Sequence, residues 1–143
     1  MKYELVKSSN KDIDRLIEYK KRTIYEYAKD LSKEEINKIN NYVTNEVPKL
    51  INDYYNIVVD NKTIGCLLLT KKDDGKLLDE IYLEEEYRNR GIGTKILKEV
   101  ISSNDIVYLW VYKENIQAIS LYKKLGFIVI DETESRYYMK CSK

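Results

Sequence analysis

The stretch YRNRGIGTKI (residues 87–96) places two arginines and two glycines directly before a helical pattern. Glycine costs a helix roughly 1 kcal/mol relative to alanine, so a pair of glycines at a helix start needs a physical reason. Free backbone N–H groups and the positive end of the helix dipole bind anions there, and glycines let the backbone come close to the anion. The stretch therefore predicts an anion site, and we interpret the anion as a pyrophosphate.

Two familiar phosphate loops do not fit this stretch. A Walker loop has four residues between its first glycine and the Gly-Lys-Ser/Thr end, whereas only Ile92 separates Gly91 from Gly93. A dinucleotide-binding fingerprint requires a third glycine where this chain has Ile96. The predicted loop is therefore of another kind.

The segments on either side place the loop between a strand and a helix. Residues 77–83 (LLDEIYL) have the pattern of a strand, residues 90–103 that of an amphipathic helix, and residues 105–112 (DIVYLWVY) that of a mostly apolar strand. A strand–helix–strand crossover predicts that the two strands are parallel neighbours. Ligands bind at the carboxyl ends of such strands, which is where the loop begins.

The other segments complete one α/β domain over residues 1–143. A strand at 3–7 precedes a helix at 10–29, for which Ser9 and Asp12 predict a capping box. Ser32 and Glu35 repeat this signal before a second helix, which is bent or broken near Pro48. Three short strands then predict an antiparallel meander, and a further helix is bounded by an Asn115 N-cap and by Gly126. The remaining strands are expected at 55–60 and 64–70, before 77–83, and in a closing hairpin at 127–131 and 136–140.

Composition excludes several classes of protein. The chain has 25 Lys plus Arg against 24 Asp plus Glu, a net charge of +1, whereas a nucleic-acid binder usually carries a basic excess. No stretch approaches the roughly 18 apolar residues of a membrane span, and the first residues lack the apolar core of a signal peptide. Two cysteines favour a reducing compartment, so we expect a cytoplasmic protein. The absence of histidine excludes Ser-His-Asp and Cys-His nucleophiles and argues against a metal site.

Residues 88–93 resemble the (Arg/Gln)-x-x-Gly-x-(Gly/Ala) loop of the GNAT N-acetyltransferase superfamily, which holds the pyrophosphate of acetyl-CoA. The segment NIQAISLYKKLGF (115–127) is similar to the second signature of that family, and the order of elements is also similar. The resemblance implies a GNAT-like fold, with a mixed, mostly antiparallel twisted sheet of about seven strands and about four helices. Its central parallel strand pair is expected to splay around acetyl-CoA.

The resemblance also implies which residues hold acetyl-CoA. The loop would bind the pyrophosphate, the end of strand 77–83 would bind the pantetheine arm through backbone groups, and a helix N-cap would add a side-chain contact. The implied cofactor-binding residues are Ile81, Tyr82, Leu83, Arg88, Asn89, Arg90, Gly91, Ile92, Gly93, Thr94, Asn115 and Tyr122.

Tyr122 is the general acid that the resemblance implies, although helical phase alone makes it a core aromatic residue. A lysine-like amine with a pKa of about 10.4 must lose a proton before it attacks, so a base is also expected. Asp79 is the first choice and Glu80 the second, and strand alternation places them on opposite faces. The alternative is that both belong to a solvated acidic strand end. Trp110 stands where some relatives keep a glutamate, so that route is absent.

The expected function is transfer of the acetyl group of acetyl-CoA, as a co-substrate, to a primary amine of a small molecule, peptide or protein. Cys66 lies in an apolar strand, which favours direct transfer in a ternary complex over a covalent acyl-enzyme. The alternative is a non-catalytic acyl-CoA-binding regulatory module on the same fold.

The expected partners are acetyl-CoA and the amine acceptor, with no nucleic acid and no membrane. The sequence leaves the oligomeric state open, a homodimer included. Residues 10–53 would shape the acceptor site. Four tyrosines there and just beyond either line a pocket or belong to core and surface: Tyr25, Tyr27, Tyr42 and Tyr54.

Overall fold

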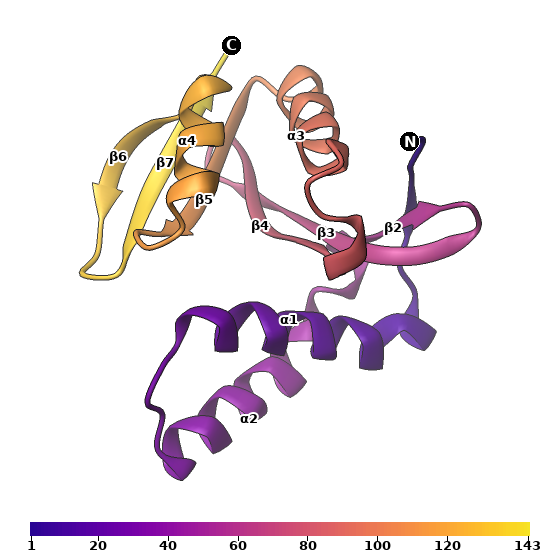
Figure 1. Ribbon diagram of the computed structural model, residues 1–143, viewed down its shortest axis with the longest axis vertical. Helices are drawn as coiled ribbons and strands as arrows, with labels where there is room; N and C mark the ends of the chain where they lie inside the picture. The colour runs from indigo at the N-terminus through magenta and orange to yellow at the C-terminus, as the bar shows by residue number, and fades with distance from the viewer. The chain divides into compact units, whose positions relative to one another are not determined.

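The computed structural model describes residues 1–143, which form a seven-stranded sheet and four α-helices (Figure 1). The strands follow the order β1-β2-β3-β4-β5-β7-β6 across the sheet. They are β1 (Glu4–Lys7), β2 (Tyr54–Val59), β3 (Lys62–Lys72), β4 (Gly75–Leu83), β5 (Ile106–Tyr112), β6 (Ile128–Glu132) and β7 (Arg136–Ser142). The helices are α1 (Ile13–Tyr27), α2 (Lys33–Lys49), α3 (Ile92–Ser103) and α4 (Ile116–Lys124).

Strand directions confirm the predicted fold class. β4 and β5 are parallel, with Lys76–Leu78 opposite Val107–Leu109. The pairs β1–β2, β2–β3, β5–β7 and β6–β7 are antiparallel. The strands on either side of α3 are therefore parallel neighbours, as predicted, and the closing hairpin also forms as predicted. Within that hairpin β7 lies next to β5, which leaves β6 at the edge of the sheet.

The chain divides into two compact units. The first unit holds Lys2–Leu68 and Glu80–Glu84, and the second holds Met1, Leu69–Asp79 and Glu85–Lys143. β3 and β4 contribute residues to both units. The single domain predicted over residues 1–143 stays a prediction.

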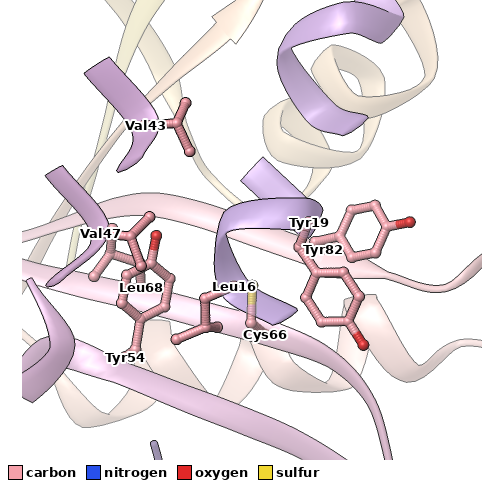
Figure 2. Close-up of a cluster of buried hydrophobic side chains, with 8 residues drawn as sticks. All are labelled: Leu16, Tyr19, Val43, Val47, Tyr54, Cys66, Leu68 and Tyr82. Carbon is pink, nitrogen blue, oxygen red and sulfur yellow. The ribbon is translucent and has the colours of Figure 1, made fainter. Parts of the chain in front are cut away.

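The first unit has a core between its two helices, the strands β2 and β3 and the end of β4. The core side chains come from helical positions three or four residues apart and from alternate strand positions, as burial of one face requires. Figure 2 shows the central cluster, which consists of Leu16, Tyr19, Val43, Val47, Tyr54, Cys66, Leu68 and Tyr82.

The helix starts of the first unit follow the capping pattern of the sequence. Ser9 and Asp12 form a capping box around a short 3₁₀ turn, and this turn delays the start of α1 to Ile13. Ser32 and Glu35 form a second capping box at α2. α2 ends one residue after Pro48, which lacks the N–H that would bond to the carbonyl of Thr44 in the last turn.

The second unit contains α3 and α4 together with β5, β6 and β7. α3 buries one apolar face, formed by Ile92, Ile96, Leu97 and Val100. Gly75 allows the close approach of β4 to β5, because a Cβ at this position would lie 2.3 Å from the carbonyl oxygen of Ile106. Among all helices of the protein, none combines the length and the apolar character that crossing a membrane requires.

Candidate functional site

The loop between β4 and α3 has the geometry of an anion site. Its first intrahelical bond runs from the N–H of Lys95 to the carbonyl of Gly91 over 3.1 Å. The N–H groups of residues 92–94 therefore have no acceptor inside the helix. The helix has no acidic residue in its first turn, and Arg88 and Arg90 precede it.

Gly91 gives the loop its shape. It is the N-cap of α3 and has a φ of 83°, in the left-handed region that favours glycine. A Cβ built on Gly91 would meet nothing within 4 Å, so the space beside the backbone is open. The helix begins at Ile92, two residues later than the sequence pattern predicts, because Gly91 turns the chain here. Gly93 and Thr94 lie half-buried in the first turn.

Two arginines stand directly before Gly91, with Arg90 exposed and Arg88 half-buried. Asn89 has a φ of 61° and is exposed, a conformation that asparagine tolerates better than most residues. The Arg90 guanidinium lies 5.7 Å from the centre of the Tyr87 ring. The N–H of Arg88 donates to the carbonyl of Glu85 over 3.2 Å. The loop thus joins positive side chains to the N-terminus of α3.

β4 alternates as the sequence predicts, and the alternation separates the two candidate bases. Asp79 is exposed, whereas Glu80 is buried. Ile81 and Leu83 are half-buried on the face of Asp79, and Tyr82 is buried on the face of Glu80. The two carboxylates therefore have different surroundings.

The Glu80 carboxylate accepts from three groups of the first unit. Its Oε1 accepts from the Tyr54 hydroxyl at 2.9 Å and lies 3.5 Å from the Lys20 ammonium. Its Oε2 accepts from the Cys66 thiol at 3.1 Å. The side chains of Lys20 and Glu80 are only 12% and 4% exposed, so this ion pair is shielded from water. A carboxylate offers about four acceptor positions, so one position remains on Oε2.

The two cysteines are unpaired and buried. Burial raises the pKa of the Cys66 thiol well above its usual value, and the neighbouring Glu80 carboxylate raises it further. Cys66 is therefore a protonated hydrogen-bond donor at neutral pH, as its apolar strand suggested. Burial also raises the pKa of the Cys141 thiol.

The Tyr82 side chain belongs to the first unit. Its ring stacks on Tyr19, with centroids 4.5 Å apart (Figure 2), and its hydroxyl accepts from Arg22 at 3.3 Å. The Tyr19 hydroxyl donates to Glu84 at 2.6 Å. Burial and this bond raise the pKa of Tyr19. The Tyr82 side chain is therefore engaged by α1 within the first unit.

Tyr122 and Asn115 lie on α4 in the second unit. Asn115 caps the helix, because its side-chain oxygen accepts from the N–H of Ala118 at 3.2 Å. Tyr122 is half-buried, and its ring lies 5.7 Å from that of Phe127. Gly126 follows the helix with a φ of 105°, as predicted for a C′ glycine. The N-cap and the end of α4 are therefore confirmed.

Sequence reasoning missed Lys20 and the role of Tyr54. The sequence does not decide whether Tyr54 lines a pocket or belongs to the core or the surface. In the structure Tyr54 is buried and its hydroxyl donates to Glu80. Tyr42 is 56% exposed, and Tyr25 donates to Asn40 at 2.6 Å. Lys20 lies 60 residues from Glu80 in the chain, so no local pattern connects the two.

A family profile described as an acetyltransferase (GNAT) domain matches residues 52–129, which is more than half of the chain. The chain belongs to the GNAT acetyltransferase family. The match includes β4, the loop before α3, and all of α4. It thus confirms the resemblance that the two motifs indicated.

Curated relatives of this GNAT protein match parts of the chain. The spermine/spermidine N(1)-acetyltransferase of Bacillus subtilis is 36% identical over 56 residues, which are 35% of this chain and 37% of that protein. The peptidyl-lysine N-acetyltransferase YjaB of Salmonella typhimurium is 28% identical over 74 residues, 52% of this chain and 48% of the relative. This chain thus spans less than half the length of these two curated relatives.

Solved structures match over the whole length. The crystal structure of a PaiA N-acetyltransferase from Thermoplasma acidophilum, in complex with coenzyme A, is similar with a TM-score of 0.76 and 25% identity, covering 100% of both chains. The solution structure of the apo form of YjaB from Escherichia coli has a TM-score of 0.70 at 20% identity, covering 98% of this chain and 95% of the other. The second match shows the fold alone.

Proposed function

We propose that this protein transfers the acetyl group of acetyl-CoA to a primary amine, by direct transfer in a ternary complex. The observation that carries the proposal is the match, over the full length of both chains, to an N-acetyltransferase in complex with coenzyme A. The open, cationic N-terminus of α3 supports it independently. In this proposal acetyl-CoA is a co-substrate, and its thioester supplies the acetyl group.

The residues of the loop fit a pyrophosphate. The N–H groups of residues 92–94 would donate to phosphate oxygens, and Arg88 and Arg90 would offset the negative charge. Asn89, Gly91 and the open space beside it would let the backbone come close. The backbone groups of residues 81–83 would bind the pantetheine arm, and Asn115 retains its amide N–H groups for a further contact.

We propose Glu80 as the general base and Tyr122 as the general acid. Glu80 is held by three donors and keeps one acceptor position, through which it would take a proton from the acceptor ammonium. Asp79, the first choice from sequence, is exposed and lacks such support, so it becomes the alternative. Tyr122 would give a proton to the departing sulfur.

An acceptor screen tests the proposed function. The protein is mixed with acetyl-CoA and either spermidine, a lysine-containing peptide or a peptide with a free N-terminus, and free thiol is measured over time. Names of two relatives, a polyamine and a peptidyl-lysine acetyltransferase, motivate this choice. Turnover with any amine supports the enzyme. Tight acetyl-CoA binding without turnover on the whole panel would favour the non-catalytic regulatory module instead.

Substitution of Gly91 tests the pyrophosphate loop. Gly91→Asn adds a side chain beside the proposed phosphate, yet asparagine tolerates a positive φ. We expect calorimetry to show acetyl-CoA affinity at least about tenfold weaker, a loss of roughly 1.4 kcal/mol. Gly126→Asn is the matched control, because Gly126 also has a positive φ and its Cβ would only touch Cys141 at 3.4 Å. Equal affinity in folded Gly91→Asn and wild-type protein would place the pyrophosphate elsewhere.

Removal of both thiols tests direct transfer. The raised pKa of Cys66 keeps it protonated, and a thiol is a poor nucleophile. We expect the folded Cys66→Ala, Cys141→Ala protein to retain most of the wild-type kcat. Its melting temperature is measured alongside, because Cys66 also donates to Glu80. Mass spectrometry that detects an acetylated cysteine during turnover would contradict the ternary-complex mechanism.

We also propose that the protein is cytoplasmic, because its two cysteines are unpaired.

A further inference from the structure

Lys20 is a charged residue on the apolar face of α1. The residues that α1 turns toward the core of the first unit recur at helical spacing, with Leu16 buried and Ile13 and Ile24 packed against the core. Lys20 lies on the same stripe, four residues after Leu16 and four before Ile24. Its side chain is only 12% exposed, and lysine is almost never buried without a partner. A charge at this position therefore needs a physical reason.

The partner of Lys20 is the Glu80 carboxylate, which also accepts from a hydroxyl and a thiol. The Lys20 ammonium lies 3.5 Å from Oε1, the Tyr54 hydroxyl 2.9 Å from the same oxygen, and the Cys66 thiol 3.1 Å from Oε2. These groups face Glu80 from α1, β2 and β3. The hydroxyl and the thiol fix the direction of the carboxylate, whereas Lys20 supplies the opposite charge.

Stability alone is a weak reason for this buried ion pair. Burial removes both ions from water, and two apolar side chains of similar size often stabilise a protein at least as well. A buried carboxyl without an opposite charge nearby favours its protonated, neutral form. A neutral carboxyl cannot take a proton from an amine, so the chemistry proposed for Glu80 requires a positive charge beside it.

We propose that Lys20 is a positioning residue that keeps the Glu80 carboxylate ionised, so that Glu80 can take the proton of the acceptor ammonium. This inference rests on the proposed role of Glu80 in acetyl transfer. Lys20 exchanges no proton in that step and acts only through its charge. Removal of the charge should therefore leave Glu80 protonated up to a higher pH, so that activity is lost at low pH and returns as the pH rises.

A pH profile of kcat/KM for Lys20→Met, from about pH 6 to about pH 9, tests this role with the best acceptor from the amine panel. Methionine matches the length of lysine without its charge. We expect kcat/KM to fall at least about tenfold at pH 7, as for loss of an opposite charge beside a carboxylate, and the loss to shrink at high pH. Lys20→Arg keeps the charge and should recover most of the activity. A loss that is equal at every pH, or no loss, overturns the proposal.

Lys21→Met is the matched control. Lys21 is the next residue of α1, is also half-buried and carries the same charge. Its kcat/KM should stay within about twofold of wild type at every pH, as is usual for a residue away from the chemistry. Lys20→Gln provides a second neutral side chain if Lys20→Met does not fold, and thermal unfolding of each variant shows which of them are folded.

A titration of Glu80 itself needs no turnover. The ¹³C signal of its carboxyl carbon, identified by its absence in Glu80→Gln, is followed against pH in wild type, Lys20→Met, Lys20→Gln and Lys21→Met. We expect half-protonation about one pH unit or more higher in the two neutral Lys20 variants, and unchanged in Lys21→Met. Equal titration in wild type and a folded Lys20 variant overturns the proposal. The expected shift in a protein that acetylates no amine of the panel would confirm the control of Glu80 by Lys20 and contradict only the proposed function.

Discussion

Glu80→Gln is expected to lower kcat/KM for a strongly basic amine by at least about a hundredfold, the range for loss of a positioned general base. An amine with a pKa of about 10.4 is well under one per cent neutral at pH 7, so removal of its proton limits the reaction. Glutamine keeps the length of the side chain but cannot take that proton. Initial rates with the best acceptor from the amine panel provide the measurement.

Asp79→Asn is the matched control for this prediction. Asp79 is the neighbour of Glu80 on β4, and it is exposed where Glu80 is buried. We expect Asp79→Asn to keep kcat/KM within about twofold of wild type, as is usual for an exposed residue outside the chemistry. If Asp79→Asn instead loses activity and Glu80→Gln does not, then Asp79 is the base, as the sequence first favoured.

The Lys20 ammonium complicates Glu80→Gln, because it would lose its charged partner in a shielded position. A buried charge without a partner destabilises a protein by several kcal/mol, roughly 3–5. Thermal unfolding of Glu80→Gln and of Glu80→Gln with Lys20→Met shows whether the variant is folded. The pH dependence of kcat/KM tests the chemical role of Glu80. The loss of kcat/KM in Glu80→Gln should shrink as rising pH deprotonates the amine, and it should also be smaller for weakly basic acceptors. A deficit that is the same at every pH and for every amine would make Glu80 structural.

The sequence predicted the local elements well because their signals are local. Ser9 with Asp12, Ser32 with Glu35, and Asn115 are caps that act within one turn, and the structure contains all three. The strand–helix–strand crossover likewise fixed the parallel pairing of β4 with β5. The place of β6 was not predictable in this way, since a hairpin pattern does not tell which of its two strands lies next to β5.

The surroundings of the candidate base could not be predicted, for the same physical reason. Alternation along β4 correctly separated Asp79 from Glu80. The three donors to Glu80, however, come from α1, β2 and β3, at separations of 60, 26 and 14 residues. Their meeting depends on packing of the core of the first unit, which no spacing in the sequence records.

The steric requirement for glycine at position 65 could not be predicted from the sequence. Gly65 lies inside the apolar run of β3, and only the residues around it favour a strand. A Cβ on Gly65 would lie 2.0 Å from the carbonyl oxygen of Tyr82, so only glycine allows the two strands to approach here. This contact helps to set the position of the β4 segment that carries Glu80. The requirement becomes visible only when the two strands are placed together.

Tyr122→Phe is expected to lower kcat by about a hundredfold, the low end for loss of one general acid. The ring and its contact with Phe127 remain, so stability and acetyl-CoA affinity should change little. Tyr122 lies seven residues past the N-cap Asn115, about 10 Å along the helix. A phenol (pKa about 10) is a weaker acid than a thiol (about 8.5), but it can hydrogen-bond to the sulfur and give it a proton while the bond to the acetyl carbon breaks.

The leaving group distinguishes this role from packing. If Tyr122 protonates the sulfur, the loss in Tyr122→Phe should shrink with an acyl donor whose thiolate is more stable, because such a thiolate needs less help to depart. Tyr137→Phe in β7 is the matched control, since it removes a hydroxyl from the same unit and keeps a half-buried ring. Its kcat should stay at the wild-type value with both donors. If Tyr122→Phe turns over within about twofold of wild type while chemistry limits the rate, then Tyr122 is not the general acid and the proton reaches the thiolate from elsewhere.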